Sequence, residues 1–272
     1  MTDTRGAGPP QAANSAPPGG SAAAPAASVG GRVDKGRRQV LAWGAAMAGV
    51  ALAPGVTLFE LAKARAPEEA ASNKVRWGML VDVNRCASGC DACVTACDKE
   101  NGLPETKTAT SAQWIRKVEL KDLRTGATKS APVMCQHCAE PPCVDVCPTG
   151  ASFKRADGIV LVDRHTCIGC RYCMMACPYQ ARSFVHEPVT GQKPEVPRGK
   201  GCVESCTLCV HRIDRGGTPA CVEACAAAGH KAIMFGNLND PGSEISLRIA
   251  ELRAAPLRPD LRLNQGVRYA GL

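Results

Sequence analysis

The stretch Cys167-Ile-Gly-Cys170-Arg-Tyr-Cys173-Met-Met-Ala-Cys177-Pro178 decides the fold of this chain. Its first three cysteines are separated by two residues each, and this spacing can hold one cubane of the [4Fe-4S] type in a single tight loop. The backbone amides of such a loop point at the sulfur atoms and offset their negative charge. The fourth cysteine begins a helix that points away, so it reaches a second cubane. The spacing therefore predicts two clusters that exchange ligands between two runs.

The other cysteines repeat this arrangement. The chain has 17 cysteines in 272 residues, and all but one fall into four runs. The second run also ends in Cys-Pro, whereas the first has one extra residue within Ala87-Ser88-Gly89, where a glycine can absorb it. In chain order the runs are Cys86, Cys90, Cys93 and Cys97; Cys135, Cys138, Cys143 and Cys147; Cys167, Cys170, Cys173 and Cys177; and Cys206, Cys209, Cys221 and Cys225.

Crossed ligation predicts four ligand sets, because the inner runs (second and third) exchange their last cysteines and the outer runs (first and fourth) do the same. The predicted sets are Cys135, Cys138, Cys143 and Cys177; Cys167, Cys170, Cys173 and Cys147; Cys86, Cys90, Cys93 and Cys225; and Cys206, Cys209, Cys221 and Cys97. Cys202 is left over. It is the alternative ligand to Cys206, but Cys206-Thr-Leu-Cys209 keeps the loop spacing, so Cys202 is expected to be a free or buried thiol.

Other uses of so many cysteines fit the spacing less well. An exported chain can carry a disulfide scaffold, but cysteines two residues apart rarely bridge each other. Zinc also takes four cysteines, but the crossed pattern that ends in Cys-Pro is not a zinc pattern. The sequence contains no Cys-x-x-Cys-His motif for c-type haem. The net charge of +8 comes with no nucleic-acid-binding motif, so no nucleic-acid partner is expected.

Residues 1–64 are interpreted as a disordered n-region followed by a twin-arginine export signal. Residues 1–31 are rich in Ala, Pro, Gly and Ser and cannot bury enough surface to fold. Arg37 and Arg38 then precede the apolar run Val40–Ala53, which is too short to span a membrane in the ordinary way. The alternative is a buried core helix. Export of a folded chain suits a cofactor that is inserted in the cytoplasm, so the expected location is the periplasm.

Short apolar segments and turn signals surround the cysteine runs. The residues 81–86 and 162–167 share a spacing in which Val-Asp leads into the first cysteine of a loop. Asp157-Gly158 is a hairpin turn signal, and a second turn is expected near Thr125-Gly126. The expected strands are Gly78–Val81, Trp114–Leu120, Thr128–Met134, Ile159–Val162 and His230–Phe235, and the expected amphipathic helix is Ser243–Ala254.

These elements predict an α+β fold of duplicated bacterial ferredoxin-like modules that bind four [4Fe-4S] clusters, with one module nested in the other. The four-cluster domain is expected over residues 65–240. The outer module takes about 75–130 and 200–240, and the inner module about 131–190. Residues 241–272 are expected to form a C-terminal helix and an irregular docking tail, which alternatively wraps the protein's own surface.

Some single side chains carry weaker expectations. His137 lies inside a cluster loop and is expected to donate a hydrogen bond near sulfur and not to bind iron. Tyr172, Met174 and Met175 are expected to pack around a cluster. The basic residues expected on a solvated face, or alternatively on a docking face, are Lys154, Arg155, Arg164 and Arg171.

Residues 75–240 resemble a known family. The segments Trp77–Asp82, Met134–Cys143 and Pro148–Ala151 are similar to those of the four-cluster ferredoxin-like subunits of membrane-associated molybdoenzyme and quinone-linked complexes. They are most similar to the DsrO-type periplasmic iron–sulfur subunits of the Dsr complex of sulfur-metabolising bacteria, with NrfC-type nitrite-reduction subunits as the alternative. The resemblance implies a polytopic quinone-interacting membrane subunit as partner and, for the Dsr type, a multihaem cytochrome c.

Three classes of function compete. The chain is expected to relay electrons between a quinone-linked subunit and redox partners in sulfur metabolism, because four clusters in one small chain give short successive hops. The alternatives are a free-standing periplasmic polyferredoxin and an enzyme. An enzyme needs a substrate pocket with an open metal site or an acid–base pair, and no motif marks one, so neither a catalytic residue nor a small-molecule substrate is expected.

Replacing both Arg37 and Arg38 by lysine should leave the protein in the cytoplasm with its clusters intact, because the export route reads the arginine pair itself. Cell fractionation measures this, with Arg32→Lys as the control that keeps the pair. Normal export of the double variant would show that the twin-arginine interpretation is wrong.

Overall fold

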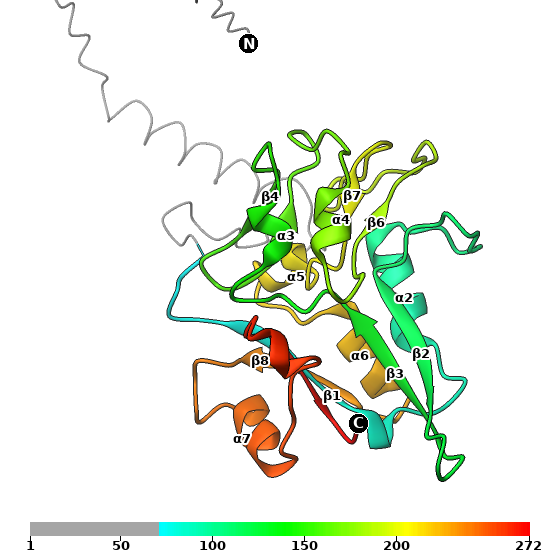
Figure 1. Cartoon of the computed structure of the whole chain (residues 1–272), viewed down its shortest axis with the longest axis vertical. Helices are drawn as coiled ribbons and strands as arrows, with labels where there is room; N and C mark the ends of the chain where they lie inside the picture. Colours follow the sequence, from blue (N-terminus) through cyan, green and yellow to red (C-terminus); the bar gives the residue numbers. More distant parts are fainter. Residues whose placement is uncertain (1–70) are drawn as a thin grey trace, which may run out of the picture. The chain divides into compact units, whose positions relative to one another are not determined.

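The structure, a computed structural model, describes residues 71–272, so the predicted export signal lies outside the described residues. The described part is a mixed α/β fold of short strands and short helices (Figure 1). The helices are α2 (Ala92–Asn101), α3 (Pro142–Asp145), α4 (Tyr172–Ala176), α5 (Val210–Ile213), α6 (Ala220–Ala227) and α7 (Glu244–Glu251), with 3-10 turns η1 (Val83–Arg85) and η2 (Pro259–Leu261). The strands are β1 (Trp77–Asp82), β2 (Ile115–Lys121), β3 (Thr128–Met134), β4 (Ser152–Lys154), β5 (Val160–Val162), β6 (Ser183–Phe184), β7 (Val203–Glu204), β8 (Ile233–Asn237) and β9 (Val267–Ala270). Within residues 71–272 no helix has the length and apolar character needed to cross a membrane.

A three-stranded sheet joins the two ends of the described chain. Strand β1 lies in its centre, antiparallel to β8 and parallel to β9. Met79 in β1 and Val267 in β9 are fully buried and lie opposite each other in the register. The predicted strand at Gly78–Val81 is confirmed, and the strand predicted from His230 begins later, at Ile233. The prediction of an irregular C-terminal tail is wrong, because its last residues form β9, held by backbone pairing that local sequence does not reveal.

Both predicted hairpins are present. Strands β2 and β3 pair antiparallel over their full length, and the turn closes through the Gly126 N–H, which donates to the Asp122 carbonyl. Strands β4 and β5 pair through a turn at Gly158, whose φ of +86° suits glycine. Each hairpin therefore forms where alternating residues meet a turn signal.

The predicted repeat also exists in the local structure. The Asp82 carboxylate accepts the backbone N–H of Asn84 at 3.1 Å, and the Asp163 carboxylate accepts that of His165 at 2.8 Å. This aspartate turn follows a strand in both cases and leads directly to the first cysteine of a loop. The two loops are therefore presented by the same local device.

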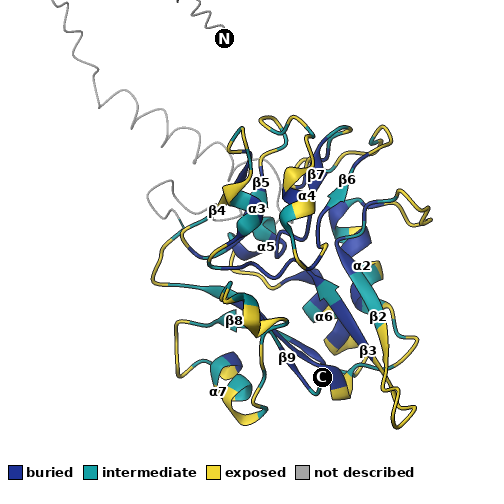
Figure 2. Ribbon diagram, in the orientation of Figure 1, coloured by how far each residue is buried: buried dark blue, intermediate teal, exposed yellow. Residues whose placement is uncertain are grey.

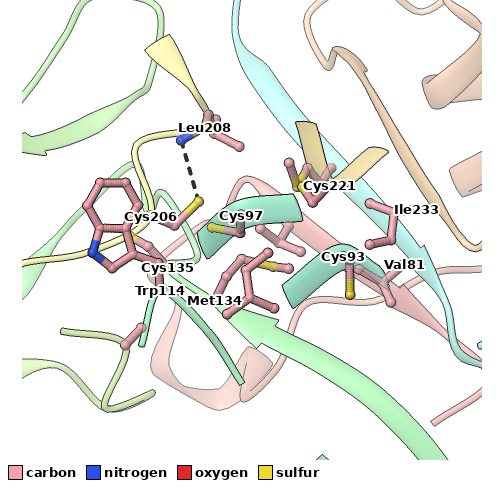
Figure 3. Close-up of a cluster of buried hydrophobic side chains, with 14 of the residues drawn as sticks. Val81, Cys93, Cys97, Trp114, Met134, Cys135, Cys206, Leu208, Cys221 and Ile233 are labelled. Carbon is pink, nitrogen blue, oxygen red and sulfur yellow. Dashed lines mark hydrogen bonds between the residues drawn. The ribbon is translucent and has the colours of Figure 1, made fainter. Parts of the chain in front are cut away.

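Cysteines fill much of the interior in place of aromatic side chains, which make up 4% of the sequence. The largest group of buried apolar residues includes cysteines from all the runs except the third, packed with Met79, Trp114 and Met134. Figure 2 shows the buried residues on the inner sides of α2, α6 and β3. Figure 3 shows Cys97, Cys206 and Cys221 within this group. A core of this kind places many sulfur atoms among its apolar side chains.

Helix α7 confirms the predicted amphipathic helix. The Ser243 hydroxyl caps its first turn by accepting the Ser246 N–H. Ile245 is buried against Leu80 of the central sheet, with Ile249 and Leu252 packed beside it. The helix therefore covers one face of this sheet.

A buried ion pair ties the long segment after β6 to the rest of the fold. The Arg198 guanidinium donates to both oxygens of the Glu204 carboxylate, at 2.6–3.2 Å, and Glu204 is fully buried. The same guanidinium donates to the carbonyl of Gly102, at the end of α2. One side chain therefore connects residues 198–204 to the end of α2, which is far away in the sequence.

Replacing Arg198 by Met should lower the free energy of unfolding by about 3–5 kcal/mol, because the Glu204 carboxylate is left buried without its partner. Anaerobic denaturant unfolding measures this. The double variant Arg198→Met/Glu204→Leu should recover most of the loss, since it leaves no lone charge. If the double variant were as unstable as the single one, the pair would contribute through packing and not through charge.

Candidate functional site

The structure brings the cysteines of distant runs together around small cavities. Three small cavities are each lined by four cysteines. The first is lined by Cys86, Cys90, Cys93 and Cys225 (the Cys86 set), the second by Cys97, Cys206, Cys209 and Cys221 (the Cys97 set), and the third by Cys147, Cys167, Cys170 and Cys173 (the Cys147 set). These groupings match three of the predicted sets, and their role as ligands stays a prediction.

The remaining cysteines form the fourth group, the Cys135 set. Burial is the main cause that raises the pKa of Cys138 to about 12, and the nearby thiols of Cys135, Cys143 and Cys177 contribute to this shift. Crossed ligation predicts the same four cysteines as one ligand set. Among residues 71–272, no three Cys, His, Asp or Glu side chains are arranged so that they could hold one metal ion.

The four cysteine loops share one backbone feature. The residue directly before the second cysteine has a positive φ in every loop: +76° at Gly89, +43° at His137, +71° at Gly169 and +54° at Leu208. Such a residue turns successive N–H groups towards one side, which forms an anion-binding concavity. The Leu208 N–H donates to the Cys206 sulfur at 3.4 Å (Figure 3).

Glycine is required at one of these positions. A Cβ atom on Gly169 would lie 2.2 Å from the carbonyl oxygen of Gly201, in addition to the positive φ. At the extended first loop, Gly89 also has the left-handed conformation, as its sequence predicts for a residue that absorbs an insertion. Non-glycine residues rarely adopt this conformation, so His137 and Leu208 are held there by their surroundings.

The last cysteine of every run accepts a hydrogen bond. Backbone N–H groups of Ser152, Ala181 and Ala232 donate to the sulfurs of Cys147, Cys177 and Cys225 at 3.2–3.5 Å. For Cys97 the donor is the buried side chain of Asn101, at 3.5 Å. Although burial alone would raise the pKa of Cys147, the bonds from Ser152 and Thr149 lower it. These donors favour the thiolate, which is the form that binds metal.

Comparison with known proteins identifies the family to which this chain belongs. A family profile described as a 4Fe-4S dicluster domain matches residues 127–237. The Hdr-like menaquinol oxidoreductase iron-sulfur subunit 1 of Archaeoglobus fulgidus is 44% identical over 264 residues, which span 87% of this chain and 97% of that protein. The chain belongs to this family of 4Fe-4S iron–sulfur subunits.

Two further relatives agree with the assignment to the iron–sulfur subunit family. A tetrathionate reductase subunit of Salmonella typhimurium is 37% identical over 250 residues, or 90% of this chain and 91% of that protein. Protein NrfC of Escherichia coli is 44% identical over 177 residues, or 64% of this chain and 71% of that protein. The predicted family and the predicted electron-transfer role are confirmed: the chain is an iron–sulfur subunit of an oxidoreductase complex and not its catalytic subunit.

The cavities of this iron–sulfur subunit fit [4Fe-4S] clusters by the chemistry of their donors. Four sulfurs line each of the three cavities, and amide or ammonium groups point at the sulfurs. Cluster ligands are thiolates, and hydrogen bonds to their sulfurs stabilise the negative charge.

Lys117 completes the Cys86 set from a different segment. Its ammonium group donates to the Cys86 sulfur at 3.3 Å and to the carbonyls of Ala87 and Cys90 at 3.2 and 2.7 Å. It therefore closes the lengthened first loop. The sequence gives no signal for this contact, because Lys117 lies on strand β2, outside every cysteine run.

His137 lies in the second loop of the iron–sulfur subunit and is fully buried beside the Cys135 set. Its Nδ1 accepts the backbone N–H of Val160 at 3.0 Å, and burial is the main cause that lowers its pKa to about 3. The ring is therefore neutral, with its proton on Nε2, which has no hydrogen-bond partner among the described residues. The bond from this proton to a sulfur stays a prediction.

The predicted packing around a cluster is wrong for two of three side chains. Tyr172 and Met175 do not pack around a cluster, since 56% and 82% of their surface is exposed. Only Met174 packs beside cysteines of the inner runs. The local spacing predicts all three near a cluster, but successive residues of helix α4 point in different directions, so only some of its side chains face inwards.

The expected basic face is also wrong in part. Arg155 is held in ion pairs with Asp157 and Asp214, and Arg164 lies over the ring of Trp114. Lys154 and Arg171 are exposed. Even these two have partners within the chain, because Lys154 donates to the Ala139 carbonyl and Arg171 lies over the Phe184 ring, and the charge pattern of the sequence does not reveal such contacts.

Cys202 takes no part in the cavities that the described residues line. Its thiol is buried and donates to the carbonyl of Arg164 at 3.3 Å. The expected free or buried thiol therefore agrees with its surroundings.

Replacing Lys117 by Gln should speed the loss of iron from the Cys86 set about tenfold or more, because hydrogen bonds to charged groups contribute about 1.5–3 kcal/mol. Iron release to a chelator measures the rate. Lys121→Gln, an exposed position on the same strand, is the control. Equal rates in the two variants would show that Lys117 does not hold the loop.

Proposed function

We propose that this subunit holds four [4Fe-4S] clusters, one in each cysteine set, and relays electrons along them. When bound, each cluster takes up and releases one electron. The observation that carries the proposal is the gathering of cysteines from distant runs into four sets, in the groups that crossed ligation requires. The residues of the chain hold the clusters apart at fixed positions and exclude water from the middle of the path.

Close contacts between sets support a linear order. Cys93 of the Cys86 set lies near Cys221 of the Cys97 set. Cys206 of the Cys97 set lies near Cys135, in the next set. Helices α2 and α6, which pack together, carry two cysteines each and connect the first two sets. The order is then the Cys86, Cys97, Cys135 and Cys147 sets.

The last step of this order crosses between the inner sets. Cys143 of the Cys135 set lies near Cys173 of the Cys147 set, and helices α3 and α4, which contain these cysteines, pack together.

Exposure of the cysteines differs between the middle and the ends of this path. All four cysteines of the Cys97 set are buried, whereas Cys86 and Cys90 at one end are half-buried. At the other end Cys170 is exposed. Electrons therefore enter and leave at the two ends, where partners can approach.

The same proposal covers the organisation of the chain. The module with the inner runs, about 131–190, is nested within the outer module, about 75–130 and 200–240, in a four-cluster domain over 65–240. Residues 241–272 follow as a C-terminal extension. The shared aspartate turn before Cys86 and Cys167 supports a duplication.

The proposed location and partners extend the family assignment. Residues 1–64 direct twin-arginine export, and the subunit works in the periplasm against a polytopic quinone-interacting membrane subunit. Relatives named for menaquinol oxidation and tetrathionate reduction support a quinone-linked role in sulfur metabolism, with a multihaem cytochrome c as a further partner. Similarity to NrfC supports a second candidate, a role in nitrite reduction.

Anaerobically purified protein should contain about sixteen irons and about sixteen acid-labile sulfides per chain, four of each for every set. Cys206→Ser should remove or convert one cluster, because it removes a ligand of the Cys97 set. Cys202→Ser, the matched control, should leave the iron count unchanged, since this thiol behaves as a small apolar residue. Iron and sulfide analysis with EPR measures both variants.

If Cys202→Ser lost a cluster while Cys206→Ser kept all four, Cys202 and not Cys206 would be the ligand in the fourth run. Zinc without labile sulfide in the wild-type protein would end the cluster proposal altogether.

A further inference from the structure

Arg182 is a buried arginine that has no carboxylate partner among the described residues. Only 5% of its surface is exposed. Arg198, the other buried arginine among residues 71–272, is paired with Glu204, and the half-buried Arg155 is paired with Asp157. None of the ion pairs among residues 71–272 includes Arg182. An unpaired guanidinium is costly to bury, so negative charge must reach it from another source.

The neighbours of Arg182 are cysteines of both inner sets. Its Nη2 donates to the Cys143 sulfur, in the Cys135 set, at 3.1 Å. The guanidinium also interacts with Cys173, in the Cys147 set, and lies near Cys135. One side chain therefore lies between two sets that supply its close negative partners.

Two donors of this guanidinium are still free for a cluster. Nε and Nη1 are buried and have no hydrogen-bond partner among the described residues. A cluster brings sulfides as well as thiolates, and charged N–H donors suit both. The position is fixed on either side, because the Ala181 N–H donates to the Cys177 sulfur and β6 begins at Ser183.

We propose that Arg182 is a tuning residue shared by the two inner clusters, which raises both reduction potentials together. This inference rests on the proposed function, because it requires a cluster in each inner set. A positive charge and hydrogen bonds to sulfur both stabilise the reduced, more negative state of a cluster. Since one guanidinium serves both clusters, an electron on either one gains from the same charge, and Arg182 does not favour one cluster over the other.

Arg182→Gln tests this inference by an EPR-monitored redox titration of the whole protein. Two of the cluster potentials should each fall by about 59 mV, which corresponds to about a tenfold change in the one-electron equilibrium constant. The other two potentials should stay unchanged. Arg116→Gln is the control, because Arg116 is half-buried and donates to the carbonyl of Tyr179 and to no cysteine. Its potentials should match those of the wild-type protein.

The inference would be overturned if Arg182→Gln shifted only one potential or none. An equal shift in the control Arg116→Gln would also overturn it. If Arg182→Gln does not retain its iron, Arg182→Lys decides, because an ammonium keeps the charge but lacks the planar fork that reaches both sets. At least one of the two potentials should then fall, and unchanged potentials would overturn the inference. Iron and sulfide content of the wild-type protein tests the proposed function separately: with all clusters present and potentials unmoved, only the role of Arg182 fails.

Discussion

Burial raises the pKa of the Cys135 thiol to about 12 and that of the Cys93 thiol to about 11, although a cluster ligand must be a thiolate. A thiol with so high a pKa keeps its proton at neutral pH, so binding of iron must displace that proton. Stabilising negative sulfur in an apolar interior is thus the constraint that the rest of the structure has to meet. The left-handed turns, the N–H donors on the last cysteines, Lys117 and Arg182 all meet it with positive or partly positive groups.

The same constraint explains why the chain needs few aromatic residues. Each set joins cysteines from segments far apart in the sequence, as Cys86 and Cys225 illustrate, so a bound cluster cross-links the fold where a conventional core would rely on large side chains. Binding energy of a metal group held in this way contributes to folding energy. The apolar residues around the sulfurs, such as Met79 and Trp114, then act mainly to exclude water.

Local pattern was sufficient for most of the site and insufficient for what surrounds it. The grouping of the cysteines around the cavities could be predicted from the spacing within each loop combined with the rule of crossed ligation, while their role as ligands stays a prediction. The hairpins and α7 could be predicted because turns and caps have short signatures. Lys117, Arg182 and the pair Arg198–Glu204 could not, since each makes its contact across elements that no short motif connects. The left-handed positions at Gly89 and Gly169 are marked by glycine, whereas His137 gives no sign that its loop requires the same turn.

Proline accounts for the different shapes of the inner and outer cysteine segments. In the inner runs Pro148 and Pro178 follow the last cysteine, and a proline restricts the residue before it to extended conformations. Helix α4 accordingly ends at Ala176, and Cys177 is extended.

The outer runs have no proline after their last cysteines, so α2 continues past Cys97 to Asn101 and α6 past Cys225 to Ala227. The extra turn of α2 places the Asn101 side chain four residues beyond Cys97, where it donates to that sulfur, a task that backbone N–H groups perform in the inner runs. The longer helices also pack against each other and enclose the Cys97 set. A difference of one residue after each run thus separates the two longer helices of the outer runs, α2 and α6, from the short helices of the inner runs, α3 and α4.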